Sequence, residues 1–282
     1  MHYIFLKIEI EGMGDKQQIK ENIKKILSSI RKNISDLICK TIPFVNQIKE
    51  KINSLSPNAK KRVISGIIIG ITTLTIVAIG GILYILSIFI VCGFMIYELV
   101  KMLKNIEEKN NKLYITLKKF GTLYVLSCCI ALILIRESFA SGAKITLWMF
   151  ITIWTLDSCA YVFGKKFGTI KLAPTISPGK TYEGAILGSA CALFMSIILY
   201  KLFGTNGAGS FSMISFVIFS IIVIILAQIS DLSESVIKRQ CEVKDSGTIL
   251  AGHGGFLDRF DSFLIVAPFI YIILFANGGV LF

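Results

Sequence analysis

The chain has 282 residues, of which 54% are apolar and 17% charged, and it carries a formal net charge of +12. So high an apolar content with so few charges excludes an ordinary soluble domain, in which about a quarter of the residues are charged. The positive charge does not indicate nucleic-acid binding, because lysine and arginine also gather in cytoplasmic loops and near anionic lipid. We therefore expect a membrane protein with membrane lipids as neighbours and no nucleic-acid partner.

The first 59 residues differ from the rest of the chain. Apolar residues recur there at spacings of three and four, which places them on one stripe of a helix: Ile19, Ile23, Ile26, Ile30, Ile34 and Leu37. This pattern fits a basic amphipathic helix on the anionic membrane surface, or a helical appendage that packs on a neighbour or forms a coiled coil. We predict a cytoplasmic N-terminal extension over 1–59, joined by a linker at 56–58 to a transmembrane domain over 60–282.

The transmembrane domain is predicted to hold about seven helical spans. Each is an apolar stretch near the roughly 20 residues that a helix needs to cross a bilayer: 63–80, 82–100, 120–135, 145–163, 183–200, 211–230 and 262–280. Gly80 and Gly81 divide the first two spans, and the third span is short. The expected fold class is all-α, a polytopic helical membrane protein.

The positions of lysine and arginine predict the orientation of these spans. With the N-terminus in the cytoplasm, 27 of the 30 basic residues lie on the cytoplasmic side and only Arg136, Lys144 and Lys201 on the other. The positive-inside rule favours this topology over its reverse. We expect an inner (plasma) membrane protein whose polar segments at 157–184 and 231–261 share the cytoplasmic face.

The first polar segment begins with Asp157, late in an apolar stretch. An ionisable group there is costly unless it is paired or faces a wet cavity, so Asp157 is a candidate functional residue. The alternative is a structural ion pair with Lys165 or Lys166.

Ser177, Lys180 and Thr181 precede a helix expected to start near Tyr182. Free backbone N–H groups and the positive dipole end favour phosphate there, although the same residues are ordinary at a helix start. A P-loop is excluded, because Pro174 stands where its first glycine is required and no β-strand is expected before it.

The second polar segment places Asp231, Ser235 and Lys238 on one face of a helix that continues the sixth span. Glu234 and Lys238 are spaced as an i, i+4 pair, which by itself is compatible with simple surface stabilisation. Lys244 and Asp245 then lie in a turn.

Glycines at 252, 254 and 255 flank His253 and let backbone approach a ligand closely. Asp258 and Asp261 follow at i, i+3 beside Arg259. Two carboxylates in this arrangement suit Mg²⁺ bound to a triphosphate, and Asp231 would close the same site.

Together these motifs resemble the integral-membrane phosphatidate cytidylyltransferases (CDP-diacylglycerol synthases). The first segment carries Asp-Ser-x-Ala-Tyr at 157–161, Lys-Leu-Ala-Pro at 171–174 and Ser-Pro-x-Lys-Thr at 177–181. The second carries Ser-x-hydrophobic-Lys-Arg at 235–239, Lys-Asp at 244–245 and His-Gly-Gly-hydrophobic-x-Asp-Arg-hydrophobic-Asp at 253–261. Tyr182, Ser230 and Ala251 depart mildly from the family pattern. The resemblance covers about 61–282.

The resemblance implies the reaction of CTP with phosphatidic acid to give CDP-diacylglycerol and diphosphate, for phospholipid biosynthesis. It implies a catalytic set of Asp231, Lys238, Arg239, Asp258 and Arg259. The implied substrate-binding residues are Ser177, Lys180, Thr181, Ser235, Lys244, Asp245, His253, Gly254 and Gly255. The hypothesised Mg²⁺ ligands are Asp231, Asp258, Asp261 and Asp157, with a second cation and a homodimer as further expectations.

Two other functions remain as alternatives. One is another CTP-dependent membrane lipid enzyme, such as a polyprenol kinase. The other is a transporter for an anionic solute, since acids inside spans, such as Asp157 and Glu98, also occur in transporters. The clustering of polar groups on one face and the lack of an inverted repeat argue against the transporter.

Overall fold

A computed structural model describes residues 28–29, 57–107, 111–203, 212–250 and 254–279. The contacts divide the chain into two units, Met1–Val63 and Ile64–Phe282. The predicted amphipathic helix of the N-terminal extension lies almost wholly outside the described residues. The predicted linker at 56–58 is partly wrong, because helix α3 already begins at Pro57.

Long apolar helices make up most of the described chain, which confirms the all-α membrane fold. They are α3 (Pro57–Ile79), α4 (Gly81–Glu107), α5 (Asn111–Ser138), α6 (Gly142–Phe167), α7 (Tyr182–Phe203), α8 (Met213–Gln240) and α10 (Phe263–Ala276), with the short α9 (Leu257–Phe260) before the last. Within the described residues, the helices α4 to α8 are long and apolar enough to cross a membrane. The apolar segments Ile64–Ile79 and Phe263–Ala276 are shorter.

Several helices extend beyond the predicted spans. Helix α5 begins at Asn111, nine residues before the predicted third span, and Lys112, Lys118 and Lys119 belong to the same helix. Helix α8 runs ten residues past the predicted end of its span and carries Asp231 and Lys238, as the one-face spacing predicted. The division at Gly80 and Gly81 is confirmed, since both have positive φ, +68° and +63°, which glycine adopts readily.

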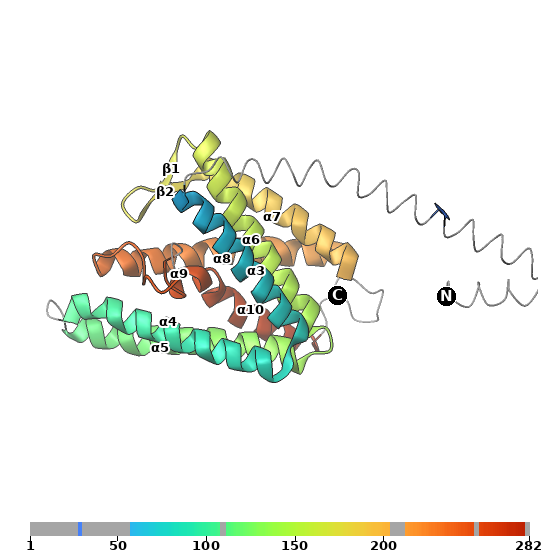
Figure 1. Ribbon diagram of the computed structural model, residues 1–282, viewed down its shortest axis with the longest axis horizontal. Helices are drawn as coiled ribbons and strands as arrows, with labels where there is room; N and C mark the ends of the chain where they lie inside the picture. The colour runs from blue at the N-terminus through green and yellow to red at the C-terminus, as the bar shows by residue number, and fades with distance from the viewer. Residues whose placement is uncertain (1–27, 30–56, 108–110, 204–211, 251–253, 280–282) are drawn as a thin grey trace, which may run out of the picture. The chain divides into compact units, whose positions relative to one another are not determined.

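The helices of the second unit pack in pairs. Helix α4 lies along α5, and α10 packs against α5 and α8 (Figure 1). Trp148 of α6 stacks near Phe216 and Phe219 of α8, and its indole N–H donates to Ser196 Oγ at 2.7 Å. Without water in a bilayer core, such internal hydrogen bonds satisfy polar groups that lipid leaves unpaired.

The closest pairing joins α6 and α7. Gly184 and Gly188 of α7 face α6, where a Cβ on Gly188 would lie 2.8 Å from Ala160 Cβ and 2.9 Å from its backbone nitrogen. Small residues four apart let two helix backbones approach in this way. The crossing holds Asp157, one turn from Ala160, at a fixed distance from the segment that precedes α7.

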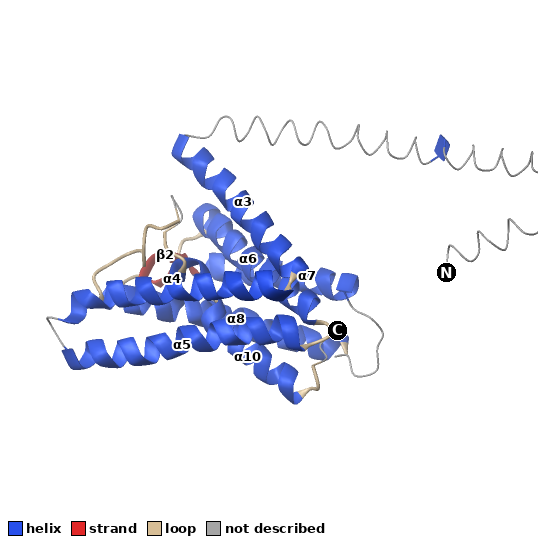
Figure 2. Ribbon diagram, turned by 60° about the horizontal axis from the view of Figure 1, so that its bottom comes forward, coloured by secondary structure: helices blue, strands red, loops and turns tan. Residues whose placement is uncertain are grey.

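A two-stranded antiparallel hairpin connects α6 to α7, and its first strand directly precedes Pro174, so the expectation that no strand lies before that position is wrong. Strand β1 (Lys171–Ala173) pairs with β2 (Ser177–Thr181) in the register Lys171 with Thr181 and Ala173 with Ser177. Figure 2 shows the strands beside loop segments at one end of the helices. The P-loop remains excluded, because the glycine pattern is absent.

The close α6–α7 crossing generates a stability prediction. We expect Gly188→Ala to lower stability by about 1–3 kcal/mol, because the added methyl group forces two packed backbones apart. The matched control is Gly93→Ala in α4, where an added Cβ meets no atom within 4 Å. There the higher helix propensity of alanine should leave stability unchanged or raised. Thermal unfolding of the purified variants in detergent measures both, and equal behaviour of the two variants would contradict the packing argument.

Candidate active site

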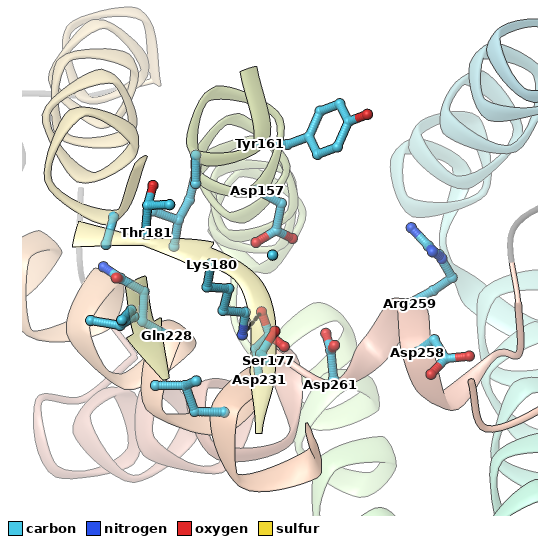
Figure 3. A pocket seen from close by; sticks show the side chains of 16 residues that line it. Asp157, Tyr161, Ser177, Lys180, Thr181, Gln228, Asp231, Asp258, Arg259 and Asp261 are labelled. Atoms are coloured by element: carbon cyan, nitrogen blue, oxygen red, sulfur yellow. Dashed lines mark ion pairs between the residues drawn. The ribbon is translucent and has the colours of Figure 1, made fainter. Parts of the chain in front are cut away.

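A cavity of about 370 Å³ lies between the two polar segments. Its walls come from α6, the hairpin, the start of α7, α8 and the α9 region, as Figure 3 shows. The polar lining residues are Asp157, Tyr161, Ser177, Lys180, Thr181, Gln228, Asp231, Asp258, Arg259 and Asp261. The structure therefore brings segments about 75 residues apart in sequence into one site.

Three carboxylates from three different elements face this cavity. Asp157 comes from α6, Asp231 from α8, and Asp261 from the junction of α9 and α10 (Figure 3). In the described part of the chain Asp157 forms no ion pair with Lys165 or Lys166; its electrostatic neighbours include Asp231 and Lys180. Desolvation of the Asp261 carboxyl, and next the negative charges of Asp231 and Asp157, raise its pKa well above the usual value.

Lys180 brings a positive charge into this acidic group. It lies on β2, and its Nζ is 2.6 Å from Asp231 Oδ2 (Figure 3). Both side chains are about a quarter exposed, so the ion pair is open to a competing ligand. Arg259 is a second, exposed cation at the cavity. An acidic wall beside two cations is an arrangement that can bind a metal-bound, multiply charged phosphate group.

Asp258 has different partners from the other acids. Its carboxylate accepts hydrogen bonds from Lys238 Nζ at 2.8 Å, from the backbone N–H of Ser246 at 3.0 Å and from that of Gly255 at 2.8 Å. Figure 3 shows this carboxylate directed away from Asp231 and Asp261. The Asp261 carboxylate accepts instead from the backbone N–H of Ser262 at 2.6 Å, so the two acids have different hydrogen-bond partners although both line the cavity.

Lys238 and Glu234 form a buried ion pair beneath Asp258. Glu234 is 4% and Lys238 8% exposed, and Lys238 contacts both Glu234 and Asp258. The interpretation of Glu234 and Lys238 as a surface pair is therefore wrong. Removing one member of a buried charge group leaves the others uncompensated, at a cost of about 3–5 kcal/mol.

The other predicted residues of the second segment lie away from the described cavity lining. Arg239 donates from Nε to the Ile176 carbonyl at 2.8 Å and from Nη1 to the Val243 carbonyl at 3.2 Å, so it links the end of α8 to the hairpin loop. Ser235 is buried, and Lys244 and Asp245 are exposed on the following loop.

Backbone contacts account for several remaining predicted residues. Thr181 Oγ1 accepts a hydrogen bond from the Gly184 N–H at 3.2 Å, as a helix-capping side chain does. Gly254 has φ +81°, and Gly255 is buried with its N–H on Asp258. His253 lies outside the described residues. Ser177 lines the cavity.

The donors suit Mg²⁺ in chemical type, because it prefers carboxylate oxygens and completes its shell with water and substrate phosphates. As placed, however, no group of three or more Asp, Glu, His or Cys side chains among the described residues is close enough to hold a metal ion by itself. The residues therefore fit a metal ion that arrives with a phosphate ligand better than one held by protein groups alone.

Sequence reasoning gave no role in the site to two residues, one in the cavity wall and one beside it. Gln228 lines the cavity and donates from Nε2 to Ser189 Oγ of α7 at 2.8 Å, tying α7 to α8. Its only signal was a lone amide in an apolar helix. Glu98 of α4 is 1% exposed and contacts the loop before α9. Its signal was an isolated acid at the end of a long charge-free stretch.

Comparisons with known proteins identify similar chains. The sequence model described as "Cytidylyltransferase family" matches residues 115–276. Proteins named phosphatidate cytidylyltransferase are similar in Staphylococcus saprophyticus (42% identical over 49% of this chain and 52% of the relative), Haemophilus influenzae (41%, over 45% and 44%) and Bacillus subtilis (40%, over 55% and 56%). The match to these curated relatives spans about half their length.

The raised pKa of Asp261 generates a pH prediction. A carboxyl group whose pKa is higher in the fold than in the unfolded chain destabilises the fold as pH rises from about 4 through the folded pKa. We expect Asp261→Asn to raise the unfolding temperature of the ligand-free protein at neutral pH and to flatten its decline with pH. Each 1 kcal/mol of relieved charge desolvation and repulsion corresponds to about 2–4 °C in unfolding temperature.

The control is Asp245→Asn, which alters an exposed carboxylate on the neighbouring loop. Thermal unfolding in detergent from pH 4 to 8, without divalent cations, measures both variants. A stability profile of Asp261→Asn that coincides with that of the unaltered protein would contradict the repulsion among the three acids.

Proposed function

We propose that this chain, which belongs to the cytidylyltransferase family, transfers a cytidylyl group from CTP to phosphatidic acid and releases CDP-diacylglycerol and diphosphate. The observation that carries the proposal is the cavity in which three acids face Lys180 and Arg259 at the junction of the two polar segments. The names of the similar proteins support the choice of phosphatidate as acceptor.

The reaction requires one phosphate oxygen of phosphatidate to form a bond with the α-phosphorus of CTP while the bond to the diphosphate oxygen breaks. Phosphatidate is already anionic near neutral pH, so no general base is required. Alignment of the reactants and neutralisation of charge supply most of the catalysis in such transfers. These are tasks for cations and for a rigid pocket.

The described side chains divide these tasks. Lys180 and Arg259 neutralise and orient phosphate groups from the two sides of the cavity. Asp157, Asp231 and Asp261 would supply carboxylate ligands to Mg²⁺ that arrives with the triphosphate, and the ion would neutralise the triphosphate further. Because Lys180 pairs with Asp231 in the ligand-free protein, a bound phosphate competes for Lys180 and releases the Asp231 carboxylate.

Asp258 has a positioning role in this proposal. Both of its oxygens are already occupied by Lys238 and by backbone N–H groups, so it orders the loop between α8 and α9. Arg239 has a similar role, because it donates to the Ile176 carbonyl of the hairpin and to the Val243 carbonyl of the segment after α8. Both residues would be needed for turnover without touching substrate.

Cytidylyl transfer in detergent tests the proposal. We expect purified protein to convert labelled CTP and phosphatidate micelles to CDP-diacylglycerol with Mg²⁺, and to stop when EDTA is added. Asp231→Asn should lower turnover by about 100-fold or more, because it removes a carboxylate proposed to bind the Mg²⁺ that neutralises the reacting phosphates.

The matched control is Glu137→Gln, which alters a carboxylate that contacts the turn at Gly81. It should keep full turnover. CTP binding without product would contradict phosphatidate as the acceptor and favour another lipid phosphate. Absence of both binding and product from folded protein would contradict the enzyme assignment.

The proposed topology has the N-terminus and the cavity in the cytoplasm, at the inner membrane. It is supported by the charge distribution, with 27 of 30 basic residues on that side. Lys244, exposed on the loop after α8, and Lys201, near the end of α7, are predicted on opposite faces.

Cysteines introduced at Lys244 and Lys201 test this topology. A membrane-impermeant maleimide added to intact cells should label Lys201→Cys and not Lys244→Cys, and opening the cells should expose both. The unaltered chain provides the background from its own cysteines. The reverse labelling pattern would overturn the orientation.

A further inference from the structure

Glu98 is a buried carboxylate that the proposed chemistry does not use. It lies on α4, is 1% exposed, and does not line the cavity. Its Oε2 accepts hydrogen bonds from the backbone N–H of Leu257 at 2.9 Å and from Ser246 Oγ at 3.3 Å. Burying a carboxylate costs several kcal/mol unless partners compensate, so its partners indicate what it is there to hold.

Those partners belong to the connection between α8 and α9, of which residues 241–250 and 254–256 are described, and to the helix that follows it. Ser246 lies in the connection, and Leu257 begins α9, which carries Asp258 and Arg259. Asp258 binds the same loop through the N–H groups of Ser246 and Gly255. Two buried carboxylates, one from α4 and one from α9, therefore hold the same loop.

The loop is shaped to fit against Glu98. A Cβ on Gly247 would lie 2.5 Å from Glu98 Oε1, and a Cβ on Gly255 would collide with Glu98 Oε2 and Ser246 Oγ. One turn before Glu98, Phe94 stacks on Phe256 with ring centroids 5.0 Å apart. Helix α4 thus contacts the loop through an aromatic stack and a carboxylate, with glycines where backbone must approach.

We propose that Glu98 is a positioning residue for cytidylyl transfer: it anchors the loop between α8 and α9 to α4 and so fixes the approach of Arg259 and Asp261 to the cavity. This role rests on the proposed function. An apolar residue could fill the same space but would leave the Leu257 N–H without its acceptor and the loop without its anchor. Displacement of reacting groups by about 1 Å is enough to lower turnover by about 100-fold.

Kinetics of four variants test this role. Glu98→Ala should lower kcat by about 10- to 100-fold while KM for CTP changes by less than about threefold, because the groups are misplaced and not removed. Glu98→Gln keeps one acceptor oxygen and should recover most of kcat. As a single variant, Gly247→Ala should also lower kcat. In the double variant with Glu98→Ala it should add no further loss, because the carboxylate with which its methyl group collides is absent.

Hydrogen exchange of backbone amides tests the anchoring of the loop by Glu98 independently of turnover. Glu98→Ala should speed exchange of the Ser246, Gly255 and Leu257 amides and leave that of α7 unchanged. The matched control is Glu137→Ala, which removes a carboxylate that accepts the Gly81 N–H at 2.8 Å. It should leave the loop amides protected.

The outcomes separate the two proposals. Wild-type turnover that survives in Glu98→Ala, additive losses in the double variant, or unchanged exchange of the loop amides would each overturn the role of Glu98. No turnover by the unaltered protein, with the loop amides still protected by Glu98, would overturn the reaction and leave the anchor itself standing.

Discussion

The site depends on a buried charge group in which Lys238 lies between Glu234 and Asp258. This group joins α8 to the segment that starts α9, and the remaining acceptor capacity of Asp258 orders the loop between them. In a low-dielectric interior, such a group is stable only when every member is paired. The geometry of the loop is therefore tied to the integrity of three side chains that bind no substrate in the proposed reaction.

In contrast to this paired charge group, the cavity holds carboxylates whose charges are only partly compensated. Asp157, Asp231 and Asp261 repel one another, and Lys180 relieves only part of that repulsion through its contact with Asp231. A site of this kind is less stable empty than filled with a compensating cation. Sites that bind charged ligands commonly contain groups that destabilise the empty site, while the surrounding residues keep the fold intact.

The fold was predictable where it depends on local sequence. Apolar stretches located the helices α4 to α8, and the i, i+4, i+7 spacing placed Asp231 and Lys238 on one helix face. The predicted spans did not show how far helices continue beyond them, as α5 does over Lys112, Lys118 and Lys119. The prediction was wrong where two short strands form. Strands of three and five residues with a proline nearby carry too little periodicity to be recognised.

By itself, the sequence determined that the chain is a helical membrane protein and which kinds of chemical groups two polar segments supply. Both follow from runs of neighbouring residues. Only the tertiary structure decided which acids share the cavity, that Asp258 turns to Lys238, and that Glu98 reaches Ser246 across 148 positions of sequence. Hydrogen bonds and ion pairs depend on distances through space, and helix packing sets those distances between residues far apart in the chain.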